Sequence, residues 1–215
     1  MFSKISLLKP LALAALLVTA GAAQATITVY TTLASFNAAT LVRGTDTFTG
    51  FSITGSTPSP VTRSAGPFTY TADAGPAGTF FGGGSTANPF LGTNTATDTI
   101  SFSGFSAGVA ALGGNFFGSN VNGLFAAGGV TLTATDASGT VTQTIASATE
   151  SSFLGFVSNT GLISATLVSV QPSTGVLWPS ADNLVLATAV PEPGTYAMML
   201  AGLGMLGFMA RRRRS

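Results

Sequence analysis

The sequence predicts an all-β fold, an antiparallel β-sandwich of the jelly-roll kind with one short helix, followed by a single C-terminal transmembrane helix. Two observations predict the sandwich. Thr, Val, Ile and Phe are abundant, and these residue types favour strands. Several segments alternate apolar and polar residues with a period of two, and Gly-rich turns separate them. A β-solenoid is the rival fold, but no fixed repeat is visible.

The first elements of the chain include the one expected helix, at 32–40. Leu33 and Phe36 are spaced i, i+3, so that they share one face, and Thr31 or Thr32 can cap the first turn.

The clearest hairpin joins a strand at 130–135 to one at 140–146 through an Asp-Ala-Ser-Gly turn. A strand at 98–105 places Ile100 and Phe102 on one face. Further strands are expected at 27–30, 46–53, 61–70, 109–117, 152–158, 162–170 and 183–187.

Composition excludes several classes of function. The 215-residue chain has no Cys and no His, and only 7% of it is charged, with a formal net charge of +1. Disulfides, a thiolate metal site, and the commonest general base and transition-metal ligand are therefore missing. A chain so close to neutral is not expected to bind nucleic acid. Thr-rich strands with so little charge protect their edges weakly, so self-association is a hypothesis.

Residues 1–25 are expected to be a cleaved signal peptide. Two lysines precede an apolar stretch at 11–20, and Ala23-Gln24-Ala25 is a small-x-small cleavage pattern that leaves Thr26 as the new N-terminus. The stretch is short for a membrane anchor, which needs about 20 residues. The Sec export machinery and signal peptidase are the implied partners. Residues 26–189 then form the exported β domain, which carries two cations and six acids.

Residues 190–215 form a second targeting element. Pro191-Glu192-Pro193 precedes an apolar run at 195–210, and Arg211, Arg212, Arg213 and Arg214 follow it. As a helix the run would be roughly 25 Å long, slightly short of a hydrocarbon core of about 30 Å, but arginine snorkelling and bilayer thinning allow one span. The arginines are expected to stay cytoplasmic and to fix the orientation, with the β domain on the other side.

This combination of Pro-Glu-Pro, one apolar helix and a terminal Arg cluster resembles the PEP-CTERM sorting signal. The resemblance implies an exported protein of Gram-negative bacteria that the tail holds in the inner membrane until exosortase cuts near the motif. It also implies a link to exopolysaccharide and biofilm. Two prolines favour the extended backbone that such enzymes need. A permanent C-terminal anchor is the alternative.

Two motifs that look chemical are interpreted as structural. Gly104-Phe105-Ser106-Ala107-Gly108 fits the nucleophile elbow, but the chain has no His to activate the serine, and the β domain has no Lys. The segment 202–207 fits G-x-G-x-x-G but lies inside the apolar tail, where a helix packing surface is the better interpretation.

Carboxylates offer two weaker hypotheses. Two of the six acids would serve a hydrolase if the fold brought them together, which is the remote alternative function. Structural calcium suits carboxylate and carbonyl oxygens, and Asp46 and Asp182 are the candidates, although no D-x-D-x-D-G run supports them.

Trp178 is the only tryptophan, and Asp182 and Asn183 follow it closely. An indole beside an acid and an amide can stack on a sugar and hydrogen-bond its hydroxyls, although burial in the core is the commoner fate. The first expectation is therefore an exported, non-catalytic surface or matrix protein processed by exosortase. A carbohydrate-binding, lectin-like module of the matrix is the alternative.

Overall fold

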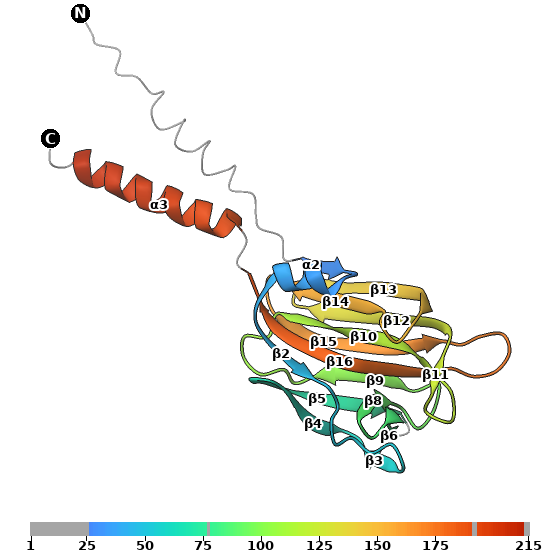
Figure 1. The fold of residues 1–215 in the computed structure, drawn as a ribbon. Helices are drawn as coiled ribbons and strands as arrows, with labels where there is room; N and C mark the ends of the chain where they lie inside the picture. Colours follow the sequence, from blue (N-terminus) through green and yellow to red (C-terminus); the bar gives the residue numbers. More distant parts are fainter. Residues whose placement is uncertain (1–25, 77, 191–192, 213–215) are drawn as a thin grey trace, which may run out of the picture.

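The computed structural model describes residues 26–76, 78–190 and 193–212 (Figure 1). Within these ranges the chain is mostly β, and every strand pairing between its strands is antiparallel. The expected signal peptide, together with Pro191, Glu192, Arg213 and Arg214, lies outside the described residues.

An eight-stranded sheet runs in the order β1-β14-β10-β16-β8-β7, while β2 also pairs with β16 and β11 with β10. Its strands are β1 (Ile27–Tyr30), β2 (Thr40–Asp46), β7 (Gly83–Ser85), β8 (Asn88–Gly92), β10 (Ala111–Ser119), β11 (Phe125–Ala126), β14 (Phe153–Ser158) and β16 (Trp178–Ala189).

A six-stranded sheet runs in the order β13-β12-β15-β9-β5-β4, and β3 and β6 form a separate pair. These strands are β3 (Ser56–Pro58), β4 (Val61–Ala65), β5 (Phe68–Gly75), β6 (Thr79–Phe81), β9 (Thr99–Ser103), β12 (Gly128–Asp136), β13 (Gly139–Ala148) and β15 (Leu162–Val170).

From β8 onward the chain crosses between the two large sheets at nearly every connection. β14, β10, β16 and β8 are neighbours in one sheet, and β13, β12, β15 and β9 are neighbours in the other. Strands that are distant in sequence therefore lie side by side, in the strand order of a jelly roll. The antiparallel sandwich is confirmed, and the solenoid alternative is excluded.

The core lies between the two sheets because their strands alternate. In β9 the buried Ile100 and Phe102 face inward, as the sequence predicted, and in β12 Val130, Leu132 and Ala134 do the same. Phe116 of β10 belongs to the same apolar cluster from the opposite sheet. Aromatic and aliphatic burial of this kind contributes roughly 1.5–3 kcal/mol per large side chain.

A short helix, α2 (Leu33–Ala38), packs on the outer face of the eight-stranded sheet (Figure 1). Thr32 is its N-cap, and the Thr32 hydroxyl accepts a hydrogen bond from the Ser35 N–H at 3.2 Å. Phe36 is fully buried against Tyr30 and Phe153. A helix with Thr32 as its N-cap is therefore confirmed, but it is shorter than the predicted 32–40, and Leu33 is exposed instead of sharing the buried face of Phe36.

Two predicted strands are wrong in extent. The expected strand at 46–53 does not exist, because β2 ends at Asp46 and a loop follows it. The Asp46 carboxylate accepts the Phe48 N–H at 2.8 Å, and this turn holds Phe48 at a φ of 53° and ends the strand. The expected strand at 61–70 is a hairpin, since a turn at Gly66-Pro67 separates β4 from β5.

The C-terminal helix α3 (Pro193–Arg212) contains the predicted apolar run. Pro193 occupies its first turn, where the missing N–H costs nothing, and Arg211 and Arg212 lie in its last turn, where cations favour the helix dipole. The prediction of a transmembrane helix is not supported, because no helix among the described residues is long and apolar enough to span a bilayer.

Candidate functional site

The first and last residues of the sandwich lie at the same end of it, beside α2. Ala189, the last residue of β16, pairs with Thr40, and the Val190 N–H donates to the Ala39 carbonyl at 3.0 Å. The Thr26 N–H donates to the Asn159 side-chain oxygen at 3.1 Å. Thr26 and Val190 line the same hollow of about 230 Å³, so both expected delivery signals attach to one end of the body.

The C-terminal chain that leaves this end of the sandwich is apolar along α3 and basic in its last turn. The side chains of Met199, Leu200, Leu203, Met205 and Leu206 on α3 are exposed. Arg211 and Arg212 follow them in the last turn. Along the sequence, the sandwich is thus followed by Pro191-Glu192-Pro193, an apolar helix and a basic end, and α3 projects from the sandwich (Figure 1).

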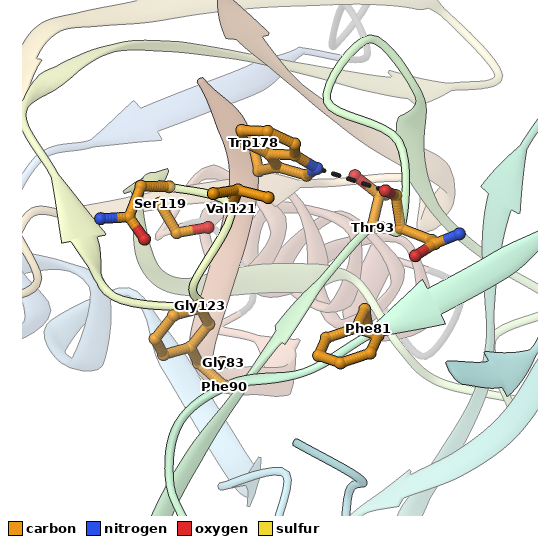
Figure 2. Close-up of a pocket in the computed structure, with 10 residues that line it drawn as sticks. Phe81, Gly83, Phe90, Thr93, Ser119, Val121, Gly123 and Trp178 are labelled. Atoms are coloured by element: carbon orange, nitrogen blue, oxygen red, sulfur yellow. Dashed lines mark hydrogen bonds between the residues drawn. The ribbon is translucent and has the colours of Figure 1, made fainter. Parts of the chain in front are cut away.

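Trp178 lines a pocket of about 120 Å³ at the opposite end of β16 (Figure 2). Its indole N–H donates to the Asn94 carbonyl at 3.4 Å. The aromatic rings of Phe81 of β6 and Phe90 of β8 also line the pocket, as does Ser119, the last residue of the neighbouring strand β10. The remaining lining residues are Gly83, Thr93, Asn94, Asn120, Val121 and Gly123.

This lining combines aromatic rings with amides and hydroxyls and contains no charged side chain. Aromatic faces pack on apolar groups of a ligand, while neutral donors and acceptors fix its orientation. The pocket is thus suited chemically to a small, uncharged, polar ligand.

Asp182 and Asn183, the expected sugar contacts of Trp178, do not line this pocket. Asn183 lines a separate groove of about 410 Å³ with Phe153, and α2 contributes Leu33 to it. The register of β10 against β16 shifts beside Gly114, and Asn183 adopts a φ of 49°, which marks a bulge. The structure therefore separates the three residues that the sequence places together.

The Asp182 carboxyl is buried and accepts the N–H of Asn183 at 2.7 Å. Burial raises its pKa above the usual value, the Asn183 hydrogen bond opposes that rise, and the negative charge of Glu150 adds to it. Neither Asp182 nor Glu150 belongs to the Trp178 pocket.

Asp46, the other calcium candidate, is engaged by protein groups across the sandwich. Arg63 of β4 donates to it twice, from Nε at 2.6 Å and from a terminal nitrogen at 2.8 Å, and Tyr70 of β5 donates at 2.7 Å. The Arg63 guanidinium also lies over the rings of Phe48 and Phe51, at 5.1 and 5.6 Å. We call Asp46, Arg63 and Tyr70 the inter-sheet triad.

Charge in the triad is compensated internally. Burial lowers the pKa of Arg63, but the hydrogen bonds and charge of Asp46 outweigh burial and raise it overall. Burial and the Asp46 charge raise the pKa of Tyr70 far above its usual value, so the phenol stays protonated and donates. Asp46 and Asp182 share no hydrogen-bond partner, and the described residues hold no cluster of three or more His, Cys, Asp or Glu side chains.

Asp136, which the sequence did not single out, is a second buried carboxylate with a structural role. It is the last residue of β12 and accepts the N–H groups of Ser138 and Gly139 at 2.7 and 3.1 Å, the Ser138 hydroxyl, and the Ser158 hydroxyl at 2.7 Å. Burial works against ionisation, but these hydrogen bonds prevail and lower the pKa of Asp136 to about 2. The Asp-Ala-Ser-Gly turn was the available signal.

The Gly-x-Ser-x-Gly segment is a loop, as its sequence interpretation held. The Ser106 hydroxyl accepts the Thr69 N–H at 3.1 Å, and the Ser106 N–H donates to the Thr69 carbonyl at 2.9 Å. Gly104 and Gly108 have φ values of 58° and 85°, which glycine adopts without strain. The serine thus ties a loop to β5.

Comparison with known proteins finds one match, confined to the C-terminus. The family model of the PEP-CTERM protein-sorting motif matches residues 189–214. No curated protein matches the chain. No solved structure matches it either. The match begins at the last residue of β16 and covers the whole projecting segment through α3. The chain is therefore a β-sandwich protein that carries a PEP-CTERM sorting signal at its C-terminus.

Proposed function

We propose that this chain is an exported, non-catalytic protein of the cell surface or extracellular matrix, delivered by exosortase processing at its C-terminal signal. The sorting-motif match at 189–214 carries the proposal. In this account signal peptidase removes residues 1–25 after Sec export, cleaving between Ala25 and Thr26. Exosortase then acts near Pro191-Glu192-Pro193, and the product takes part in an exopolysaccharide-rich matrix.

The placement of the motif supports processing. Val190 is still tied to the sandwich through its N–H, and α3 begins at Pro193, so the site lies between two ordered elements. A short Pro-flanked segment between them favours the extended backbone that proteases and transpeptidases bind. The apolar side chains of α3 and the arginines 211–214 would hold the precursor at the membrane.

The test replaces Pro191, Glu192 and Pro193 by alanine in a bacterium that produces exosortase. The C-terminal mass of the exported chain and its location are then compared with wild type. A matched control replaces Pro172-Ser173-Thr174, an exposed loop between β15 and β16, by alanine. We expect the motif variant to keep its C-terminal segment and to stay membrane-associated, while the control is processed. Equal processing of both variants would refute it.

A carbohydrate-binding role is the second candidate, and the Trp178 pocket favours it. Its aromatic and neutral polar lining suits a sugar, whose two ring faces are apolar and whose edge carries hydroxyls. Asp182 and Asn183 are not needed in this version, because they line no part of the pocket.

Binding is measured by pull-down on exopolysaccharide and by quenching of the single tryptophan. Trp178→Ala is expected to abolish the pull-down, whereas Phe153→Ala, in the separate groove, should retain it. Equal retention of both variants would assign any binding to another surface.

A further inference from the structure

Strand β13 ends the six-stranded sheet and pairs only with β12 among the described strands. It is ten residues long, with the sequence Gly-Thr-Val-Thr-Gln-Thr-Ile-Ala-Ser-Ala. An edge strand has a row of backbone N–H and C=O groups that point away from its sheet, so it can accept another strand.

The other strands at the sheet edges are shorter than β13, and two of them carry an arginine; the register of β13 against β12 shifts once, between Ile145 and Ala148. At the opposite edge β4 has five residues, includes Arg63 and lies between Pro60 and Pro67. In the other sheet β1 and β7 have only four and three residues. β2 has seven residues and carries Arg43. β13 contains no charged residue and no proline, and it is the longest of these strands.

The surface beside this edge is neutral and ordered. Threonine hydroxyls bond across β12 and β13 in three successive pairs, Thr131–Thr144, Thr133–Thr142 and Thr135–Thr140, at 2.8, 2.9 and 3.0 Å. The row of cross-strand partners that contains Thr133 and Thr142 continues through Thr166 of β15 to Ser101 of β9. Because these side chains are held by each other and carry no charge, two copies meet here without like-charge repulsion.

We propose that β13 pairs antiparallel with the β13 of a second copy, so that two six-stranded sheets become one continuous sheet. The stretch of β13 from Gly139 to Ile145 pairs with β12 without a register shift and has no charge and no proline, so it is complementary to itself under a two-fold axis. Paired residues must face the same side of the joined sheet, so the axis passes next to Gln143 or Thr144, at the middle of the strand. Since β4 is blocked, the assembly closes as a dimer and does not grow into a fibre.

The absence of cysteine from the chain makes a direct test available. Single cysteines are introduced into the full chain at Gln143, at Thr144 and, as a control, at Thr131. Thr131 is the cross-strand partner of Thr144 on β12, one strand in from the edge. Directly opposed residues of an antiparallel pair lie about 4.5–5.5 Å apart between Cα atoms, within reach of a disulfide.

We expect mild oxidation to link two chains through position 143 or 144 and to give at least ten times less linked dimer from position 131. Equal yields at the edge and at position 131 would overturn the proposal, because pairing of two β13 strands brings residues of the edge strand together and not those of β12. The apolar tail is common to all three variants, so association through α3 affects them equally.

A second pair of variants tests the unmodified interface. Thr144→Lys places like charges beside the two-fold axis, while Thr131→Lys breaks the same Thr131–Thr144 hydrogen bond without charging the edge strand. Mass is then measured in mild detergent. The assembly formed by Thr144→Lys should be lighter than the wild-type assembly by the mass of one chain, whereas the mass of the Thr131→Lys assembly should be unchanged. An unshifted Thr144→Lys variant would overturn the pairing. C-terminal processing is read separately by mass spectrometry, so either proposal can fail alone.

Discussion

Because Arg63 belongs to the inter-sheet triad, its replacement should lower the free energy of unfolding more than the replacement of most other polar residues. Arg63→Met keeps most of the aliphatic stem but removes the guanidinium that donates twice to Asp46. The Asp46 carboxylate is only 5% exposed, so it would be left as a buried charge without its counter-ion.

Breaking a buried ion pair by removing one partner costs about 3–5 kcal/mol. Asp46 keeps the Tyr70 hydroxyl and the Phe48 N–H, which places the loss near the lower end of that range. Loss of the cation–π contacts with Phe48 and Phe51 adds about 0.5–1 kcal/mol. The total of about 3–4 kcal/mol corresponds to a fall in Tm of roughly 6–16 °C for a domain of this size.

Urea unfolding followed by the fluorescence of Trp178, the only tryptophan, measures this free energy. Arg43→Met is the matched control, because Arg43 is exposed and its guanidinium bonds only carbonyls and a hydroxyl of its own region. It should cost less than about 1 kcal/mol. The double variant Asp46→Leu with Arg63→Met should be more stable than Arg63→Met alone, since no unpaired charge remains. A loss below about 1 kcal/mol for Arg63→Met would mean that the Asp46–Arg63 ion pair contributes no more than an exposed pair.

Three further predictions concern stability. The pKa of Asp136 is about 2 in the folded chain and about 3.9 when unfolded, so its stabilisation is complete above pH about 5 and is lost as the pH falls toward 2. Urea unfolding at several pH values should show this slope in wild type and a smaller one in Asp136→Asn; equal slopes would contradict it. Gly44→Ala should lower the free energy of unfolding by about 1–3 kcal/mol, because a Cβ at this position overlaps the Ala65 carbonyl where β2 passes β4. Gly55→Ala is the control: its Cβ would have its nearest neighbour at 3.7 Å, so it should change thermal unfolding little. Phe36→Ala should lower the free energy of unfolding, measured by calorimetry, by about 3–5 kcal/mol. Leu33→Ala, on the exposed side of α2, should lower it much less. Similar losses of stability in the two variants would mean that α2 is not anchored by Phe36.

The parts of the fold that follow local rules could be predicted from the sequence. The β12–β13 hairpin alternates apolar and hydroxyl side chains around an Asp-Ala-Ser-Gly turn, and the structure pairs Thr133 with Thr142 accordingly. The sorting motif was equally readable, because its three components are contiguous in the chain.

Other elements depend on partners that are distant in sequence. Threonine-rich segments favour strands throughout, so composition did not reveal that β2 ends at Asp46, where Arg63 and Tyr70 from the other sheet bind the carboxylate. The strand β7 is mostly glycine and gives no alternating pattern, yet it pairs with β8.

The candidate site shows the same limit. Trp178 and Asn183 are five positions apart, which favoured one site, but they lie in separate hollows along β16 and a bulge re-aims the strand at Asn183. The lining of the Trp178 pocket comes from β6, β7, β8 and β10, which only the folded sandwich brings together.

The intact mass of the exported chain shows whether exosortase removes its C-terminal segment. Recovered from a bacterium that produces exosortase, the chain is expected to begin at Thr26 and to lack α3 and the terminal arginines. Deleting the exosortase should restore the C-terminal segment to the recovered chain. An exported chain that keeps all four arginines in the presence of exosortase would contradict the account.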